Sequence, residues 1–261
     1  MLGALKSTIK KQAWWYFIAD SIIYQKFTNA SGYRSFLEEN YFYESIIGNA
    51  NKLIFDVGAN VGTKSKIFAN LSDKVVLFEP DLENLKILNA RLKSTHGCII
   101  NGCALSNKAS VANYYSIGND SAYNSLSEKH INTVVKTRKI IENDSNLTQY
   151  EVSTNTLDFF IDKYGTPDYI KIDVEGFEKE VVSGLTVLVP LISVEGNLPE
   201  FLNETIAIIN YLDRLSAGKY EFNYVITSHL ELKEFTTAAL LINELHVLKV
   251  KSVEVYCRLK N

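Results

Sequence analysis

Apolar and polar positions alternate along most of this chain in two patterns, which predict strands and helices in turn. Short apolar runs rich in β-branched and aromatic residues are typical of buried strands, and apolar positions three and four residues apart are typical of helices. The predicted strands comprise residues 53–55, 75–78, 98–101, 169–172, 191–194, 222–227 and 253–258. The predicted helices comprise residues 64–71, 82–92, 156–164, 177–185 and 204–215. This alternation predicts an open, mostly parallel α/β sheet with helices on both faces.

The N-terminal residues 1–50 depart from this alternation and are rich in aromatic side chains. Their spacing predicts one helix around Trp14–Ile22 and a second over Phe36–Tyr43. We expect a helical extension that packs on the core or forms a lid over the substrate. Lys10 and Lys11, together with the nearby tryptophans, also permit a weak peripheral contact with a membrane surface.

The polar segment Ser116–Tyr150 is the second departure, and it predicts an insertion or flap. It follows a turn at residues 106–108 that enters a further strand ending near Tyr115. Its basic residues predict a solvated face or a recognition surface for an anionic acceptor; they are Lys129, His130, Lys136, Arg138 and Lys139. The predicted organisation is therefore a helical extension over residues 1–50 and one domain over residues 51–261.

Composition and charge narrow the class of protein. Of the 261 residues, 46% are hydrophobic and 22% are charged, as in a globular domain with a sizeable core. The net charge of −3 gives no argument for a nucleic-acid partner. The three cysteines show neither CxxC nor zinc-site spacing. We therefore expect them to be core residues with free thiols in a reducing compartment, the cytoplasm. No apolar run reaches the roughly 20 residues of a membrane span, and no cleavage site of small residues is evident near the N-terminus.

The segment Leu53–Thr63, LIFDVGANVGT, predicts a strand, a glycine turn and the start of a helix. In an open α/β sheet this arrangement builds a nucleotide site at the carboxyl end of the first strand. Gly58 and Gly62 carry no side chain, so we expect the backbone to come close to a ligand there. Asp56 and Asn60 supply acceptors and a donor at the same crevice. An ordinary tight βα turn is the alternative interpretation.

Polar residues end most of the predicted strands, and in a parallel sheet such ends line one crevice. These residues are Asp56, Glu79, Asn101, Asp173 and Glu195. Glu79 lies about twenty residues after the glycine turn, where a carboxylate accepts the ribose hydroxyls of an adenosine cofactor. The pattern G-x-G-x-x-G is absent, and Asp56 would repel a diphosphate but suits an ammonium or sulfonium group. The cofactor S-adenosylmethionine is therefore favoured over a dinucleotide.

Five motifs, taken together, carry a family resemblance that covers roughly residues 52–197. They are DVGANVG (Asp56–Gly62), FEP (Phe78–Pro80), NGCALSN (Asn101–Asn107), TLDFF (Thr156–Phe160) and IKIDVEGFEKEVVSG (Ile170–Gly184). This set resembles the FkbM family of S-adenosylmethionine-dependent methyltransferases. The resemblance implies a class I methyltransferase fold, Rossmann-like with seven strands, and methyl transfer to a hydroxyl of a sugar, glycan or related natural product.

The resemblance also implies roles for residues of this chain. The methionine part of the cofactor would be bound by Asp56, Gly58, Asn60 and Gly62, and its ribose by Glu79. Its adenine would be flanked by Asn101, Cys103 and Ala104, and Asp173 would sit at its reactive end. Two features depart from the usual pattern of the family, namely the long segment 116–150 and the Glu195-Gly-Asn that follows the fifth predicted strand.

Transfer to an alcohol needs a base near the acceptor oxygen, and carboxylates surround the fourth and fifth predicted strands. The candidate catalytic residues are Asp173, Glu175 and Glu195, because like charges in one cleft raise some of their pKa values. The same carboxylates could instead hold a divalent cation that lowers the pKa of the acceptor hydroxyl. Glu178 is more typical of a residue at a helix N-terminus, and Lys171 is expected to pair with Asp173.

Histidines offer a further source of bases. His130 and His229 lie in predicted loops and could reach a cleft, although a lone histidine is more often solvated or satisfied in the core. The favoured function is an S-adenosylmethionine-dependent O-methyltransferase with a carbohydrate-like acceptor. The alternatives are a non-catalytic module of the same fold, which would bind the cofactor without turnover, and a nicotinamide-dependent oxidoreductase. The acceptor, any metal requirement and the oligomeric state do not follow from the sequence.

Overall fold

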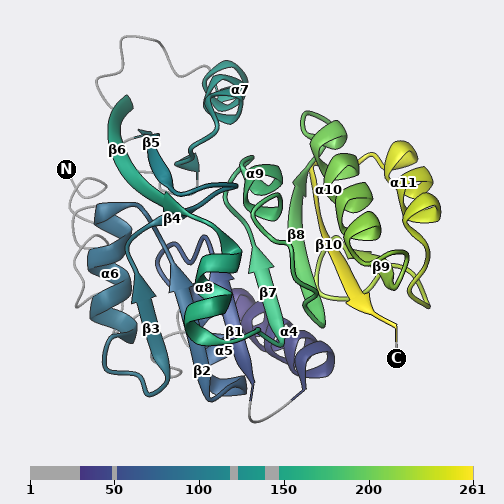
Figure 1. The fold of residues 1–261 in the computed structure, drawn as a ribbon, viewed down its shortest axis with the longest axis horizontal. Helices are drawn as coiled ribbons and strands as arrows, with labels where there is room; N and C mark the ends of the chain where they lie inside the picture. The colour runs from purple at the N-terminus through teal and green to yellow at the C-terminus, as the bar shows by residue number, and fades with distance from the viewer. Residues whose placement is uncertain (1–29, 49–51, 118–122, 139–146, 261) are drawn as a thin grey trace.

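A seven-stranded sheet forms the centre of the molecule (Figure 1). The computed structural model describes residues 30–48, 52–117, 123–138 and 147–260. The strands of this sheet, in spatial order, are β3 (Cys98–Asn101), β2 (Lys74–Phe78), β1 (Leu53–Val57), β7 (Tyr169–Ile172), β8 (Leu191–Asn197), β10 (Ser252–Leu259) and β9 (Tyr220–Val225). The strands from β3 to β8 run parallel, whereas β10 runs antiparallel between β8 and β9. The predicted seven-stranded, mostly parallel sheet is confirmed.

Helices cover both faces of this sheet because successive strand residues point to opposite sides. On β1, Ile54 belongs to a core that includes Phe68, whereas the next residue, Phe55, belongs to a core that includes Phe160. The first core contains side chains of α4 (Ala30–Ile47), α5 (Thr63–Leu71) and α6 (Leu82–Leu92). The second contains side chains of α8 (Leu157–Tyr164), α9 (Glu178–Val182), α10 (Leu202–Leu215) and α11 (Ala238–Val247). Helix α11 lies outside the predicted helices, although Leu241 and Leu245 are four residues apart and buried.

Helix α4 contains the second helix predicted in the N-terminal region and extends beyond it at both ends. Its side chains Phe42, Tyr43 and Ile47 are buried. The ring of Tyr43 meets the ring of Phe68 edge to face, at 4.9 Å between centroids. This helix is therefore part of a core layer. The helix predicted around Trp14–Ile22, and with it the predicted lid and membrane contact, lies outside the described residues.

A second sheet, of order β4-β6-β5, stands at the end of the main sheet where β1, β2 and β7 finish (Figure 1). Its strands are β4 (Ala104–Leu105), β5 (Ser110–Ile117) and β6 (Leu147–Asn155), and α7 (Glu128–Arg138) lies between the last two. The described parts of the segment 116–150 therefore form regular structure next to the carboxyl ends of the central strands. Whether this segment is an insertion stays a prediction.

The end of β8 corrects a prediction. Glu195-Gly-Asn was expected after the strand, but these residues lie inside it. Strand β10 pairs with β8 as far as Asn197, with Glu254 opposite Glu195 and Val253 opposite Gly196. Strand β10 forms backbone hydrogen bonds with these polar residues and so extends β8 through them. The hydrophobic pattern of residues 191–197 did not indicate this extension. Among the described residues, no helix is both long enough and apolar enough to cross a membrane.

Candidate active site

Two pockets lie at the carboxyl edge of the main sheet and share the side chain of Asp173. The first has a volume of about 680 Å³ and lies over the ends of β1, β2 and β7. The second has a volume of about 560 Å³ and lies between the ends of β7, β8, β9 and the start of β10. Residues that lie far apart in sequence thus meet at one edge, as the strand-end pattern predicted.

The glycine turn after β1 is shaped by contacts inside the protein. Gly58 has a φ of 83°, and a Cβ atom built there would lie 1.8 Å from the backbone oxygen of Asp173. At Gly62 a Cβ atom would lie 2.7 Å from Leu88 and 2.9 Å from Leu92. The predicted reason for these glycines, space for a ligand, is therefore only part of the explanation. Gly58 does line the first pocket, together with Asn60, whereas Gly62 lies outside its lining.

Glu79 is the buried carboxylate of the first pocket. Its Oε2 accepts a hydrogen bond from the backbone N–H of Asn60 (2.7 Å), and its Oε1 accepts one from that of Asp81 (2.8 Å). Burial raises the pKa of Glu79 to about 7 in spite of these donors. An ionised carboxylate has about four acceptor positions, so one is left after contacts with Asn60, Asp81 and Asn84. Glu79 therefore keeps acceptor capacity toward the pocket.

The predicted adenine segment is only partly on the pocket surface. Cys103 and Ala104 line the first pocket. Asn101 lies outside its lining, and its side chain accepts a hydrogen bond from the hydroxyl of Tyr164 (3.1 Å). The Asn101 amide also donates to the carbonyl of Leu77 (3.4 Å). Both contacts hold the edge strand β3 to its neighbours, so Asn101 has a structural role in this arrangement.

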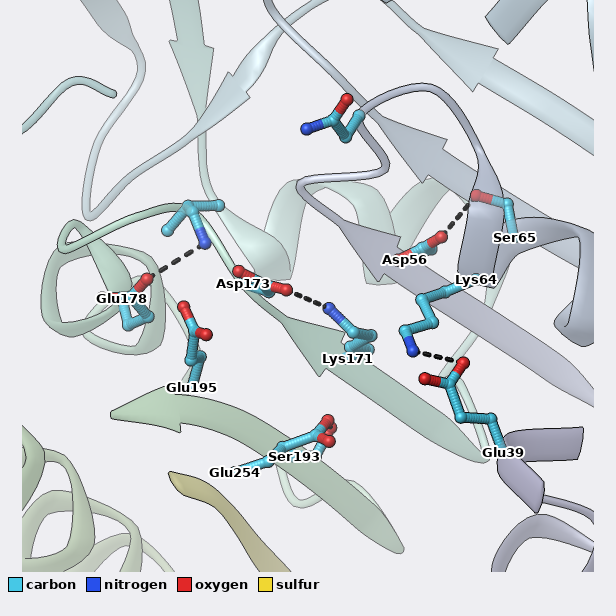
Figure 2. Close-up of polar contacts among 12 residues, drawn as sticks. Glu39, Asp56, Lys64, Ser65, Lys171, Asp173, Glu178, Ser193, Glu195 and Glu254 are labelled. Atoms are coloured by element: carbon cyan, nitrogen blue, oxygen red, sulfur yellow. Dashed lines mark hydrogen bonds and ion pairs between the residues drawn. The ribbon is translucent and has the colours of Figure 1, made fainter. Parts of the chain in front are cut away.

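Asp56 is fully buried beneath the turn and lies outside the lining of both pockets. Its Oδ2 accepts a hydrogen bond from the hydroxyl of Ser65 (2.5 Å; Figure 2), while its Oδ1 has no hydrogen-bond partner among the described residues. Burial raises the pKa of Asp56, and the ammonium of Lys171 partly opposes this shift. The side chain of Asp56 is not exposed to either pocket, so the predicted direct contact between Asp56 and a ligand is absent from this arrangement. The unpaired Oδ1 nevertheless remains an acceptor behind the turn.

Asp173, Glu175 and Glu195 form an acidic cluster, in which one oxygen of each carboxylate lies within 4.8 Å of the others. The Nζ of Lys171 lies 2.7 Å from Asp173 Oδ2, which confirms the predicted pair (Figure 2). Burial alone would raise the pKa of Asp173, but the Lys171 ammonium lowers it below its usual value. Burial alone would lower the pKa of Lys171, but the surrounding carboxylates raise it. Asp173 and Lys171 are therefore charged at neutral pH.

The other two carboxyls of the acidic cluster hold protons more tightly. Burial, with the negative charge of Asp173, raises the pKa of Glu175 to about 8. Burial and the same neighbour raise the pKa of Glu195 well above its usual value. The two residues face different spaces, because Glu175 lines the first pocket and Glu195 lines the second. Carboxyls with raised pKa values in a cleft suit proton transfer near neutral pH.

Glu178 supports the loop that carries this cluster. Its Oε1 accepts hydrogen bonds from the backbone N–H groups of Val174 and Gly176, each at 3.0 Å. Glu175, between these two residues, has a φ of 57°, which is unusual for a residue with a side chain. Glu178 therefore stabilises a turn that places the Glu175 side chain. This role is close to the predicted one at a helix N-terminus.

Of the two candidate histidines, His229 lies in a loop as predicted, whereas His130 does not. His130 lies on helix α7 and is buried, with its Nε2 3.7 Å from Oε2 of Glu175. His229 has a largely exposed side chain, 3.6 Å from Glu231, and lies outside both pockets. Lys129 of the basic segment pairs with Glu204 at 2.6 Å. His130 was thus expected in a loop but is held by a helix next to the acidic cluster.

The small sheet supplies a wall of the first pocket that was not predicted. Tyr114, Asn124 and Leu126 line this wall. The Asn124 amide donates to Oδ2 of Asp81 (3.2 Å), and the hydroxyl of Tyr150 donates to the same oxygen (2.9 Å). Asp81 also caps α6, so the small sheet is fastened to the main domain at the pocket. The sequence signal for this sheet was the alternation of Tyr150 and Val152 with polar residues along β6.

Comparison with known proteins gives a family match over most of the chain. A family model described as the methyltransferase FkbM domain matches residues 56–226. A search of curated protein sequences finds no match. The matched range contains the glycine turn, Glu79 and the acidic cluster.

The solved structures that match this chain include two with methyltransferase descriptions. One is described as methyltransferase FkbM from Methylobacillus flagellatus KT, with 14% identity and a TM-score of 0.51. The match covers 84% of this chain and 47% of that chain, so this chain spans about half the length of that protein. Another is described as precorrin-6y C5,15-methyltransferase from Geobacter metallireducens GS-15, with 10% identity, a TM-score of 0.43 and coverage of 85% and 88%.

Proposed function

Because this chain belongs to the FkbM family of S-adenosylmethionine-dependent methyltransferases, we propose that it transfers a methyl group to a hydroxyl of a sugar, glycan or related natural product. The observation that carries the proposal is the position of Asp173 between two pockets of different character. The first pocket suits the cofactor and the second suits a polar acceptor. Methyl transfer requires that the two meet at one point.

The first pocket fits the cofactor in its chemistry. Glu79 keeps an acceptor position that suits a ribose hydroxyl, and the apolar side chains of Val57, Leu105 and Phe177 suit contact with a base or a methionine chain. The unpaired Oδ1 of Asp56 suits an ammonium group, which could reach it only if the turn that covers it moved. S-adenosylmethionine, when bound, supplies a methyl group on a sulfonium. The negative charge of Asp173 at the far end of this pocket favours a cation there.

The second pocket is lined mainly by groups that form hydrogen bonds, which favours an acceptor with several hydroxyls. These groups include Lys64, Lys171, Glu195, Thr227, Ser252 and Glu254. Lysine and carboxylate side chains together can donate to and accept from a polyol. Lys64 is held by Glu39 at 2.5 Å, so its position is fixed by helix α4 (Figure 2). A carbohydrate hydroxyl in this pocket would lie beside the acidic cluster.

The acidic cluster is proposed to take the proton that the acceptor hydroxyl loses. Asp173 is held ionised by Lys171, whereas Glu195 has a raised pKa and lines the acceptor pocket. A carboxyl of raised pKa keeps its own proton at neutral pH, so the ionised Asp173, which also lines this pocket, would accept the proton of the hydroxyl as transfer proceeds. Lys171 keeps Asp173 charged and in place during this step.

Cofactor binding tests the first half of the proposal. Calorimetry should show that S-adenosylhomocysteine binds to the wild-type chain with micromolar affinity. Glu79→Ala should weaken this binding at least about tenfold, because the ribose loses its acceptor. Glu83→Ala is the matched control, since Glu83 is an exposed carboxylate on the neighbouring helix α6. Absence of binding to the wild type would refute the proposed cofactor site.

Turnover tests the second half. The chain is incubated with methyl-labelled cofactor and a panel of sugars and glycans, and the labelled product is identified by mass. A methyl ether on a hydroxyl is expected, and Asp173→Asn should abolish its formation while S-adenosylhomocysteine still binds. Label on nitrogen or carbon would refute O-methyl transfer. Cofactor binding without any turnover, unchanged by Asp173→Asn, would favour the non-catalytic alternative.

A further inference from the structure

An open groove lies beside the second pocket, between helix α4 and the loop that follows β9. It is lined by side chains from residues 38–46 and 227–230, and we call it the outer groove. Thr227 lines both the outer groove and the second pocket, so the two spaces adjoin at this residue. Helix α4 forms a wall of both, because it supplies Tyr43 to the second pocket and Tyr41 to the outer groove. A ligand longer than the second pocket would therefore continue into the outer groove.

The outer groove combines apolar and polar side chains in about equal number. Its apolar side chains are those of Tyr41, Phe42, Ile46 and Leu230. The polar ones can donate or accept hydrogen bonds, and they include those of Glu38, Ser45, Ser228 and His229. An alkyl chain would cover these polar groups without pairing them, which costs free energy. A sugar ring presents an apolar face of C–H groups and a rim of hydroxyls, so it matches both kinds of lining.

Tyr41 offers a surface on which a sugar ring can stack. Its side chain is 70% exposed, whereas the next side chain, that of Phe42, is buried in the core. Glu38 and Ser45 lie three residues before and four residues after Tyr41, so the three side chains lie on one face of α4. An aromatic ring that is exposed in this way gains free energy when it covers an apolar surface of a ligand. Polar groups on either side of the ring suit the hydroxyls of such a ligand.

We propose that the acceptor is an oligosaccharide, with the sugar unit that is methylated in the second pocket and a neighbouring unit stacked on Tyr41 in the outer groove. This inference rests on the proposed function, because it extends the same acceptor beyond the second pocket. Glu38 and Ser45 would bind hydroxyls of the stacked unit from α4, and Ser228 would bind them from the loop. A single sugar in the second pocket forgoes these contacts.

Acceptors of different length test the proposal in the labelled-cofactor assay. Each sugar of the panel is offered as its methyl glycoside and as a linear oligosaccharide of the same sugar. The KM of the oligosaccharide should be at least about tenfold lower, with a similar kcat, because the additional contacts lie away from the reacting atoms. Equal KM values for the two forms would overturn the proposal.

Substitutions of Tyr41 separate stacking from other causes of such a preference. Tyr41→Ala should reduce the ratio of the two KM values by about tenfold, whereas Tyr41→Phe keeps the ring and should preserve the ratio. Leu240→Ala is the matched control, since Leu240 is 56% exposed on α11 and lines neither the outer groove nor the two pockets. It should stay within about twofold of the wild-type ratio. A folded Tyr41→Ala variant with the wild-type ratio would contradict the stacking.

Photo-cross-linking identifies the occupant of the outer groove without any turnover. The full chain with Tyr41→p-benzoylphenylalanine is irradiated together with the same oligosaccharides. A covalent adduct with an oligosaccharide is expected, and much less adduct with the methyl glycoside. An adduct with residues 1–29 of the same chain would assign that segment to the groove and overturn the proposal. An adduct with an octyl glycoside in place of the oligosaccharide would assign an alkyl chain and overturn it as well.

The failure of this inference and the failure of the proposed function give different results. Oligosaccharide adducts at position 41, in a chain that binds no S-adenosylhomocysteine and forms no methyl ether, would support glycan binding and refute the methyltransferase proposal. Methylation of both acceptor forms with equal KM values, and no oligosaccharide adduct at position 41, would do the reverse.

Discussion

At the scale of single residues, carboxylates of the same chemistry have different roles here because their partners differ. Glu79 and Glu178 accept backbone hydrogen bonds and shape loops, and burial raises the pKa of each to about 7. Asp173 is paired with a buried lysine and stays ionised. Glu175 and Glu195 lack such a partner among the described residues and have raised pKa values. The neighbours of each carboxyl therefore decide whether it stabilises a loop or takes part in chemistry.

Glu178 gives a prediction about pH. Burial raises its pKa to about 7 in the folded chain from an ordinary value of 4.5, so the folded state binds more protons between these values. Its contribution to stability is full below about pH 4.5 and is lost as the pH rises toward 7. Glu178→Gln keeps an oxygen for the amides of Val174 and Gly176 but cannot ionise. When the pH is raised from 5 to 8, the unfolding free energy of the wild type should fall by about 2 kcal/mol more than that of the variant.

Urea unfolding at the two pH values measures this difference. Glu180→Gln, on the same helix, is the control, and it should follow the wild type within about 0.5 kcal/mol. An identical pH dependence for Glu178→Gln and the wild type would show that Glu178 is not a buried carboxyl of raised pKa.

At the scale of elements, the unit that builds the first pocket is strand β1, its turn and helix α5. The backbone N–H groups of Gly58 and Ala59 both donate to the carbonyl of Phe78 at 3.0 Å, and that of Asp173 donates to Val57, also at 3.0 Å. The turn is thereby fixed between β2 and β7. Gly58 permits this because it has no Cβ atom, and the space that a Cβ atom would need is occupied by the backbone of Asp173 at the end of the neighbouring strand. The glycine is therefore required by the close approach of the turn after β1 to the end of β7, and not by the turn conformation alone.

Gly58→Ala should therefore destabilise the chain more than an alanine at another glycine of positive φ. Gly218, with a φ of 76° and nothing within 4 Å of its Cβ position, is the matched site. Gly218→Ala should cost about 1 kcal/mol from backbone strain, whereas Gly58→Ala adds a clash and should cost about 3 kcal/mol. Urea unfolding of the two variants measures the losses. Equal losses would contradict the contact with Asp173.

At the scale of the whole molecule, the main sheet lies between two apolar cores. The first pocket opens where strands from both sides of the chain reversal end, whereas the second opens among strands on one side of it. Strands β1 to β3 run outward on one side, and the chain then returns to place β7 on the other side of β1. Helix α4 completes the core that faces α5 and α6. Its Tyr43 and Glu39 also reach the second pocket, one by lining it and one through Lys64. The N-terminal helix is thus linked to both the core and the site.

The role of α4 in the core predicts unequal effects of two adjacent substitutions. Phe42 is 9% exposed and meets Tyr256 edge to face at 5.6 Å, whereas Tyr41 is 70% exposed. Phe42→Ala should lower the unfolding free energy by about 3–5 kcal/mol. Tyr41→Ala should change it by less than about 0.5 kcal/mol. Denaturant unfolding checks both, and a small effect of Phe42→Ala would show that α4 is a detachable extension.

Local patterns by themselves determined most strands and helices of the main sheet, the glycine turn and the polar strand ends, because hydrophobic period and turn chemistry act between residues close in sequence. The pairing of Lys171 with Asp173 also followed from adjacent positions. Only the tertiary structure decided that Asp56 is covered, that Glu195 lies inside β8, and that His130 faces Glu175. These facts depend on contacts between segments distant in sequence, namely β10 on β8 and α7 beside the loop after β7. Such contacts exist only once the chain has folded, and no local period encodes them.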